Sequence, residues 1–161
     1  MFPDVRARSF PEANVELPRN AGNWAVVSIG EPETDPPLGF NRQNPLHLRL
    51  EFHDIVEPLT LGDKIFTPPK IEHVEMLIDF AKMARGARVV YCHCVAGISR
   101  STAAAYILRC VWAGSGGESE ALIDVYADRP QAWPNERMVE FADQILGRGG
   151  SLLKTLRAHQ A

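Results

Sequence analysis

A nine-residue segment near the middle of the chain combines a thiol, a guanidinium group and a glycine at close spacing. It reads His93-Cys-Val-Ala-Gly-Ile-Ser-Arg-Ser101, with Gly97 midway between Cys94 and Arg100. The planar arginine fork can bind two phosphate oxygens at once, and glycine allows a backbone conformation that a side chain would obstruct. These residue types and their spacing indicate a loop that binds an anion.

Cys94 is the candidate nucleophile of this loop. Where a loop leaves a strand and enters a helix, its backbone N–H groups converge beside the positive end of the helix dipole. Those N–H groups, the dipole and Arg100 all favour the thiolate, which is the reactive form of cysteine. A thiolate beside a phosphate site is what nucleophilic phosphoryl transfer requires. We expect Ser101 to donate a hydrogen bond to the thiolate and His93 to orient the loop through hydrogen bonds.

The hydropathy pattern places this segment between a strand and a helix. Apolar runs and period-two alternation predict strands over 24–29, 46–52 and 87–93. A period of 3.6 predicts helices over 71 to about 86, 99–111, 118–127 and 136–146, and a short amphipathic helix over 151–159. Strands separated by helices predict an α/β fold of three layers, in which helices flank a central mixed or mostly parallel sheet.

The length and composition indicate one soluble domain over residues 1–161. The chain has 161 residues, of which 45% are hydrophobic and 23% charged, enough to bury one core. Ten of the twelve prolines lie within residues 1–70, so we expect a loop-rich N-terminal part over 1–45, with short strands between turns. Residues 151–161 are expected to form a short C-terminal tail that docks on the same domain rather than on a membrane.

Charge and hydropathy exclude several classes of partner. The net charge of −3 argues against a dedicated nucleic-acid binder, which normally has a basic excess. No apolar run approaches the roughly 18 residues needed to span a bilayer, and the N-terminus has no apolar stretch of the signal-peptide type. We therefore predict a cytoplasmic protein without nucleic-acid or membrane partners. The oligomeric state stays open.

The three cysteines are too few and too clustered for a disulfide framework. Because no Cys-x-x-Cys or histidine pair lies elsewhere in the chain to complete a metal site with Cys92, His93 and Cys94, we predict neither a metal nor another cofactor. Cys92 and Cys110 are expected to pack in the core. A redox role for Cys92, through a strained disulfide with Cys94, stays open.

Residues 93–101 resemble the active-site motif of the cysteine-dependent protein tyrosine phosphatase superfamily. The stretch 96–101 is most similar to the dual-specificity branch and its small bacterial relatives, and the order of elements agrees over about 46–146. The resemblance implies a phosphotyrosine protein phosphatase-like fold and metal-independent hydrolysis of phosphate monoesters through a phosphocysteine. It also implies that the phosphate is held by Val95, Ala96, Gly97, Ile98, Ser99 and Arg100.

The resemblance further implies a general acid, an Asp on a loop upstream of the nucleophile. Asp54 directly follows the predicted strand 46–52 and is the favoured candidate, while Asp63 is the alternative. Residues 57–69 contain three prolines and a glycine, which indicates an inserted loop at the border of the cleft. This insertion keeps the assignment of the acid open.

The implied substrates are phosphorylated proteins or small phosphomonoesters. Phosphotyrosine is the first expectation, and phosphoserine and phosphothreonine stay open. Val95, Ala96 and Ile98 give the loop no lysine, which disfavours multiply phosphorylated inositol lipids. Two other functions remain: a non-catalytic phosphate-binding module without a working acid, and sulfur transfer on a rhodanese-like fold.

Overall fold

A four-stranded parallel sheet forms the centre of the computed structural model, which describes residues 1–20 and 22–161. The strand order is β1-β6-β2-β3, and every pairing in it is parallel. Parallel strands end at a common edge, where ligands bind in open α/β sheets. The strands are β1 (Asp4–Arg8), β2 (Ala25–Gly30), β3 (His47–Glu51) and β6 (Val89–His93).

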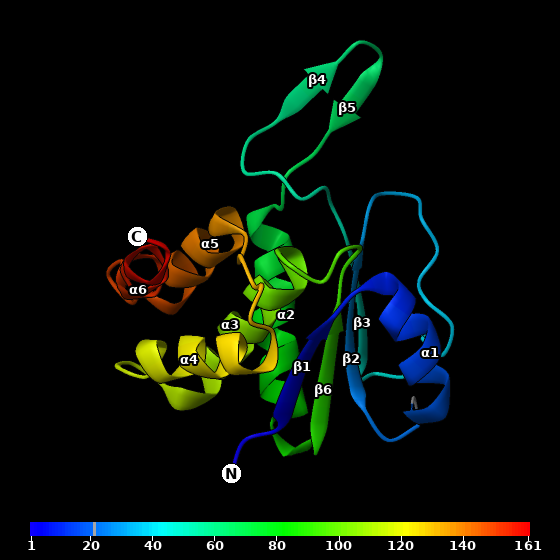
Figure 1. Ribbon diagram of the computed structural model, residues 1–161, viewed down its shortest axis with the longest axis horizontal. Helices are drawn as coiled ribbons and strands as arrows, with labels where there is room; N and C mark the ends of the chain where they lie inside the picture. Colours follow the sequence, from blue (N-terminus) through cyan, green and yellow to red (C-terminus); the bar gives the residue numbers. More distant parts are fainter. Residues whose placement is uncertain (21) are drawn as a thin grey trace.

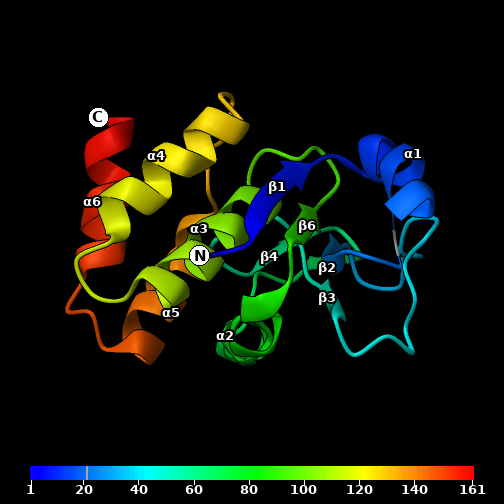
Figure 2. The same ribbon diagram turned by 90° about the horizontal axis from the view of Figure 1, so that it is seen from below.

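Helices cover both faces of this sheet (Figures 1 and 2). Helix α1 (Phe10–Asn20) packs on one face, where Ala13 and Leu17 contact Val26 and Tyr91. The opposite face of the strands joins the main core with the remaining helices. These are α2 (Ile71–Met83), the short 3₁₀ helix η1 (Ala84–Gly86), α3 (Arg100–Ala113), α4 (Glu118–Asp128), α5 (Glu136–Leu146) and α6 (Ser151–Gln160).

Helix α3 is the element that places the loop at the sheet edge. It lies against β1, β2 and β6 in the middle of the helical layer. Its run of Ala103, Ala104 and Ala105 is buried, and such small side chains allow a helix to approach its neighbours closely. Strand β6 is buried at all of its five positions, as expected for a central parallel strand. The loop between these two elements is therefore anchored at both ends by buried secondary structure.

The predicted mostly parallel sheet flanked by helices is confirmed. The predicted strands correspond to β2, β3 and β6, and the predicted helices to α2 through α6. Helix α6 docks on its own domain, since Leu152 and Leu156 are buried and Tyr106 donates a hydrogen bond to the Leu152 carbonyl at 2.9 Å. None of the helices in the described part of the chain is long and apolar enough to cross a bilayer.

The N-terminal part differs from the loop-rich prediction, because it contains β1 and α1. Ser9 and Glu12 form a reciprocal capping box, in which each side chain accepts a hydrogen bond from the other residue's N–H. Pro11 lies in the first turn of α1 and Pro18 near its end. A proline in the first turn removes no intrahelical hydrogen bond. The proline count was therefore a misleading indicator of irregular structure.

The predicted inserted loop over 57–69 contains a β-hairpin. Its strands β4 (Leu59–Leu61) and β5 (Lys64–Phe66) pair antiparallel around Gly62 and Asp63. Gly62 has a φ of +61°, a conformation that favours glycine. The hairpin projects away from the sheet and the helices (Figure 1). Only its base can therefore lie close to the loop that follows β6.

Candidate active site

The loop of residues 94–99 passes directly against the junction of β1 and α1. Gly97 has a φ of +71°, and a Cβ atom there would lie 2.6 Å from the backbone of both Arg8 and Ser9. Only glycine combines this left-handed conformation with so close an approach. The central glycine of the motif is therefore required by the loop's packing as well as by its turn.

Every carbonyl of residues 94–99 accepts a hydrogen bond from outside this loop, at 2.6–3.5 Å. Because the N–H and C=O of a peptide unit point in opposite directions, this arrangement turns the loop's N–H groups inward. Of the N–H groups of residues 95–100, only that of Gly97 donates to another group in the described residues, Cys94 Sγ at 3.2 Å. The donors to the carbonyls are His93, Phe10, Arg129, Trp133, Thr102, Asn135 and Ala103.

Arg129 is one of these donors, and sequence reasoning missed it. Its Nε donates to the Gly97 carbonyl at 3.0 Å, and its Nη2 lies 2.8 Å from a Glu12 carboxylate oxygen. Burial raises the pKa of Glu12, but hydrogen bonds from Arg129 and Ser9 outweigh it and hold this pKa at about 2. Glu12 is therefore ionised, and the pair ties the loop to α1. The sequence signal was an arginine two residues after a predicted helix, which is too common a feature to single out.

Cys94 lies at the base of the loop with a 2% exposed fraction. Its Sγ is 3.2 Å from Ser101 Oγ and 3.2 Å from the Gly97 nitrogen. Both groups can donate hydrogen bonds to a thiolate, and the N-terminus of α3 follows at Arg100. The structure thus places the Ser101 hydroxyl and one loop N–H group at the sulfur atom of Cys94, in the loop that leads into α3.

Arg100 is buried, and one nitrogen of its guanidinium group is held by the protein. Its Nη1 donates to the Phe52 carbonyl at 2.7 Å and lies 3.4 Å from a Glu31 carboxylate oxygen. Its Nε is buried and has no hydrogen-bond partner in the described residues. An unpaired buried donor costs about 1–3 kcal/mol, and an anion in the loop would remove that cost. The guanidinium is therefore oriented by Phe52, the residue directly after β3, and its Nε is still able to bind a ligand.

His93 belongs to a buried chain of hydrogen bonds behind the loop. Burial lowers the pKa of its imidazole to about 4, so the ring is neutral near pH 7. Its Nδ1 lies 3.1 Å from the Cys94 carbonyl, which can only accept, so Nδ1 carries the proton. Ser28 Oγ, 2.6 Å from Nε2, then donates to the ring and accepts from Arg49 Nη1 at 2.8 Å. The expected orienting role of His93 agrees with this geometry.

The neutral His93 predicts a loss of stability in mild acid. Between its ordinary pKa of 6.5 and the folded value of about 4, only the unfolded chain binds the proton. The contribution of the neutral His93 to the stability of the fold is therefore complete above pH 6.5 and is lost as the pH falls to 4. We expect this group to lower the free energy of unfolding by about 3 kcal/mol over that range. Urea unfolding at several pH values measures it.

The control separates His93 from the carboxylates that also titrate in acid. His93→Gln should flatten the pH dependence of the unfolding free energy, whereas His159→Gln, at an exposed position of α6, should leave it as in the wild type. An equal loss of stability in the wild type and His93→Gln between pH 6.5 and 4 would contradict the assignment.

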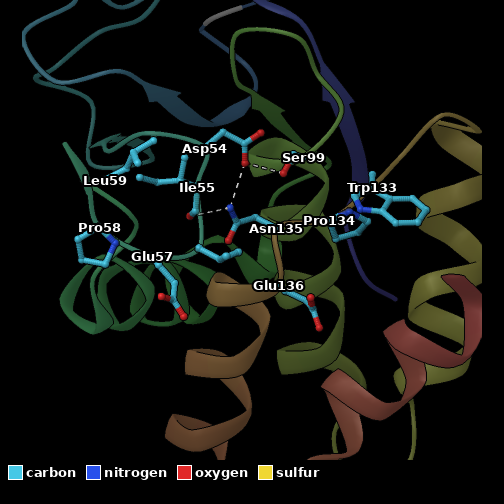
Figure 3. A pocket seen from close by; sticks show the side chains of 11 residues that line it. Asp54, Ile55, Glu57, Pro58, Leu59, Ser99, Trp133, Pro134, Asn135 and Glu136 are labelled. Carbon is cyan, nitrogen blue, oxygen red and sulfur yellow. Dashed lines mark hydrogen bonds between the residues drawn. The ribbon is translucent and has the colours of Figure 1, made fainter. Parts of the chain in front are cut away.

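Asp54 lies next to the loop, and within the described residues its carboxylate accepts hydrogen bonds at one oxygen (Figure 3). Ser99 Oγ donates to its Oδ1 at 2.6 Å and Asn135 Nδ2 donates to the same atom at 3.0 Å. The proton of a protonated Asp54 would therefore reside on Oδ2. Asn135 also caps α5, since its Oδ1 accepts from the Met138 N–H. Asp63, the alternative acid, lies in the turn of the projecting β4–β5 hairpin.

A cleft of about 520 Å³ opens beside Asp54 and Ser99. In Figure 3, Pro58 and Leu59 lie on one side of it and Trp133 on the other. The base of the β4–β5 hairpin therefore borders the cleft, as expected for the 57–69 segment, whereas its turn does not. The lining residues are Asp54, Ile55, Val56, Glu57, Pro58, Leu59, Ser99, Trp133, Pro134, Asn135 and Glu136.

Comparison with solved structures identifies the fold. The chain superposes on human DUSP28 with a TM-score of 0.63 and 18% identity, covering 92% of this chain and 95% of that one. DUSP15 gives a TM-score of 0.55 and 22% identity over 97% and 90% of the two chains. This is the dual-specificity phosphatase fold. PTPMT1, solved in complex with PI(5)P, shares the dual-specificity phosphatase-like fold at a TM-score of 0.57 and 18% identity, over 98% and 95%.

No protein-family model matches the chain, and the search of curated proteins gave no match. The predicted phosphotyrosine protein phosphatase-like fold is confirmed by the solved structures, while the resemblance to small bacterial members stays a prediction. Within the dual-specificity phosphatase fold of this chain, the sequence located the loop and Asp54 but missed the residues that support them. These residues are Ser28, Glu31, Arg49 and Arg129. Asn135 is a further support, because it donates a hydrogen bond to Asp54 as well as capping α5.

Proposed function

We propose that this protein hydrolyses phosphate monoesters, with phosphotyrosine in proteins as the first substrate and phosphoserine and phosphothreonine as further ones. The observation that carries the proposal is the loop of residues 94–99, whose carbonyls are all held from outside. Inward N–H groups, the buried Nε of Arg100 and the sulfur of Cys94 form a site for a tetrahedral anion above a nucleophile.

In the first step the Cys94 thiolate attacks phosphorus. The S–P bond forms while the bond between phosphorus and the leaving oxygen breaks, and the protonated Oδ2 of Asp54 supplies the proton to that oxygen. The N–H groups of residues 95–100 and the Arg100 guanidinium hold the three equatorial oxygens as charge shifts among them. The products are the free alcohol or phenol and a phosphocysteine.

In the second step water attacks the phosphocysteine. Asp54, now a carboxylate, accepts a proton from that water as the new P–O bond forms and the S–P bond breaks. Ser101 Oγ, 3.2 Å from Cys94 Sγ, donates a hydrogen bond to the departing thiolate. Inorganic phosphate leaves, and both Cys94 and Asp54 return to their starting protonation states.

The direct test is hydrolysis of an aryl phosphate by the wild-type protein in the presence of a chelator. We expect steady turnover that the chelator leaves unchanged, with a bell-shaped pH–rate profile from a thiolate and a protonated carboxyl group. Acid quenching during turnover should leave one phosphoryl group on the peptide that contains Cys94, detected by mass spectrometry. Activity that requires an added metal ion would contradict the proposal.

The second function considered is a module that binds phosphate without turnover. The position of Asp54, with Oδ1 held by Ser99 and Asn135 and Oδ2 without a partner in the described part of the chain, supports the enzyme instead. A carboxyl group so placed can give up and recover a proton. We further propose that the protein works in the cytoplasm, where a reduced Cys94 would remain active.

A further inference from the structure

The cleft beside Asp54 differs in character from the anion loop. Trp133, Val56 and Leu59 line it with exposed fractions of 58%, 46% and 43%. Such large apolar side chains are costly to leave in water, and all three line this one cleft. Ser99 belongs both to the loop and to this cleft, so a group bound in the cleft adjoins the phosphate site.

The charged groups of the cleft are acidic. Glu57 makes no ion pair or side-chain hydrogen bond within the described residues, and the only partners of the Asp54 carboxylate there are the neutral Ser99 and Asn135. Glu136 is paired with Arg157. Because Asp54 is protonated in the proposed first step, Glu57 is the carboxylate of the cleft that has no cationic partner within the described residues. Its charge would repel a second phosphate and attract a positive charge.

Resting on the proposed function, we infer that this cleft selects phosphopeptides with a bulky apolar residue next to the phosphorylated one and a basic residue beyond it. The apolar side chain lies between Leu59 and Trp133, on opposite sides of the cleft in Figure 3, and the basic residue pairs with Glu57. We favour a peptide over a phosphoinositide because the unpaired carboxylate of Glu57 in this cleft opposes an anionic lipid surface.

The experiment compares phosphotyrosine peptides that differ at one flanking position. We expect kcat/KM for a leucine-flanked peptide to exceed that of its aspartate counterpart by about tenfold or more on one side of the phosphotyrosine. Arginine two positions away should be preferred over glutamate. Equal rates for all flanks, or faster hydrolysis of a monophosphorylated inositol lipid in vesicles than of any peptide, would overturn the inference.

Variants locate the selectivity in the cleft. Leu59→Ala should reduce the leucine-to-aspartate ratio, and Glu57→Lys should reverse the preference between arginine and glutamate. Ile123→Ala, at an exposed apolar position of α4, should change neither ratio. Unchanged ratios in Leu59→Ala and Glu57→Lys would contradict the placement of the peptide.

Failure of this inference is distinguishable from failure of the proposed function. If the protein hydrolyses an aryl phosphate but does not discriminate among the peptides, the cleft assignment is wrong and the proposed function still stands. Absence of aryl phosphate hydrolysis would sink the proposed function, and the cleft is then tested by fluorescence anisotropy. The same peptides, bound to Cys94→Ser protein, should show the same order of affinities, and equal affinities would reject the cleft as well.

Discussion

Cys94→Ser is expected to lower kcat for an aryl phosphate by at least about 10⁴-fold. A serine hydroxyl fits the space of the thiol beside Ser101 and the Gly97 N–H. It is a far weaker acid than a thiol, so it remains protonated and is a poor nucleophile. The loop carbonyls keep their outside donors, so the anion site persists. We therefore expect the variant to bind inorganic phosphate, measured by calorimetry, while hydrolysis measured by release of the phenol is lost.

The matched control is Cys110→Ser, which changes another buried cysteine, within α3. This variant is expected to lower the melting temperature, because it places a hydroxyl in the core, yet to keep kcat per folded molecule. Substantial turnover by Cys94→Ser would remove the phosphocysteine from the mechanism. Loss of both turnover and phosphate binding in that variant would indicate that the loop, rather than the nucleophile, was disrupted.

Asp54→Asn is expected to lower kcat for an alkyl phosphate by about 10²–10³-fold. The amide keeps an oxygen to accept from Ser99 and Asn135 but cannot protonate the leaving oxygen. A nitrophenolate leaves without a proton, so the loss for nitrophenyl phosphate should be smaller. The pH–rate profile should also lose its basic limb, which reports the protonated carboxyl group. Initial rates with both substrates from pH 5 to about 8 measure these effects.

Asp63→Asn is the control, since it makes the same chemical change in the turn of the β4–β5 hairpin. Its rates and pH profile should equal those of the wild type. A large loss in Asp63→Asn together with a small one in Asp54→Asn would reverse the assignment of the general acid. It would also require the hairpin to fold back over the loop during turnover.

The sequence predicted those parts of the site that lie on one short stretch of chain. Cys94, Gly97 and Arg100 are neighbours in sequence, and their geometry follows from the strand before them and the helix after them. Asp54 could be placed because it follows β3, whose end lies at the same edge of the sheet. The family resemblance implied an upstream aspartate as the acid, and the predicted strands and helices then placed Asp54 at the same edge of the sheet as Cys94 and Arg100.

The supports of the loop could not be predicted, because each is a pairing across a long stretch of chain. Arg129 reaches Gly97 from the end of α4, and Arg49 reaches His93 only through Ser28. The residues that flank an isolated arginine in the sequence do not indicate which distant carbonyl its side chain will contact. The N-terminal helix was missed for a different reason: the prediction rested on the number of prolines, although the first turn of a helix tolerates Pro11 and a capping box between Ser9 and Glu12 begins it.

The outside donors to the loop carbonyls also determine when during synthesis the site can exist. Cys94 leaves the ribosome before Arg129, Trp133 and Asn135, which hold the carbonyls of Gly97, Ile98 and Ser99 outward. A nascent chain that ends before Asn135 therefore has the nucleophile without the anion site, and domains of this kind fold as units. The complete anion site can therefore form only after α4 and the segment that precedes α5 have been synthesised.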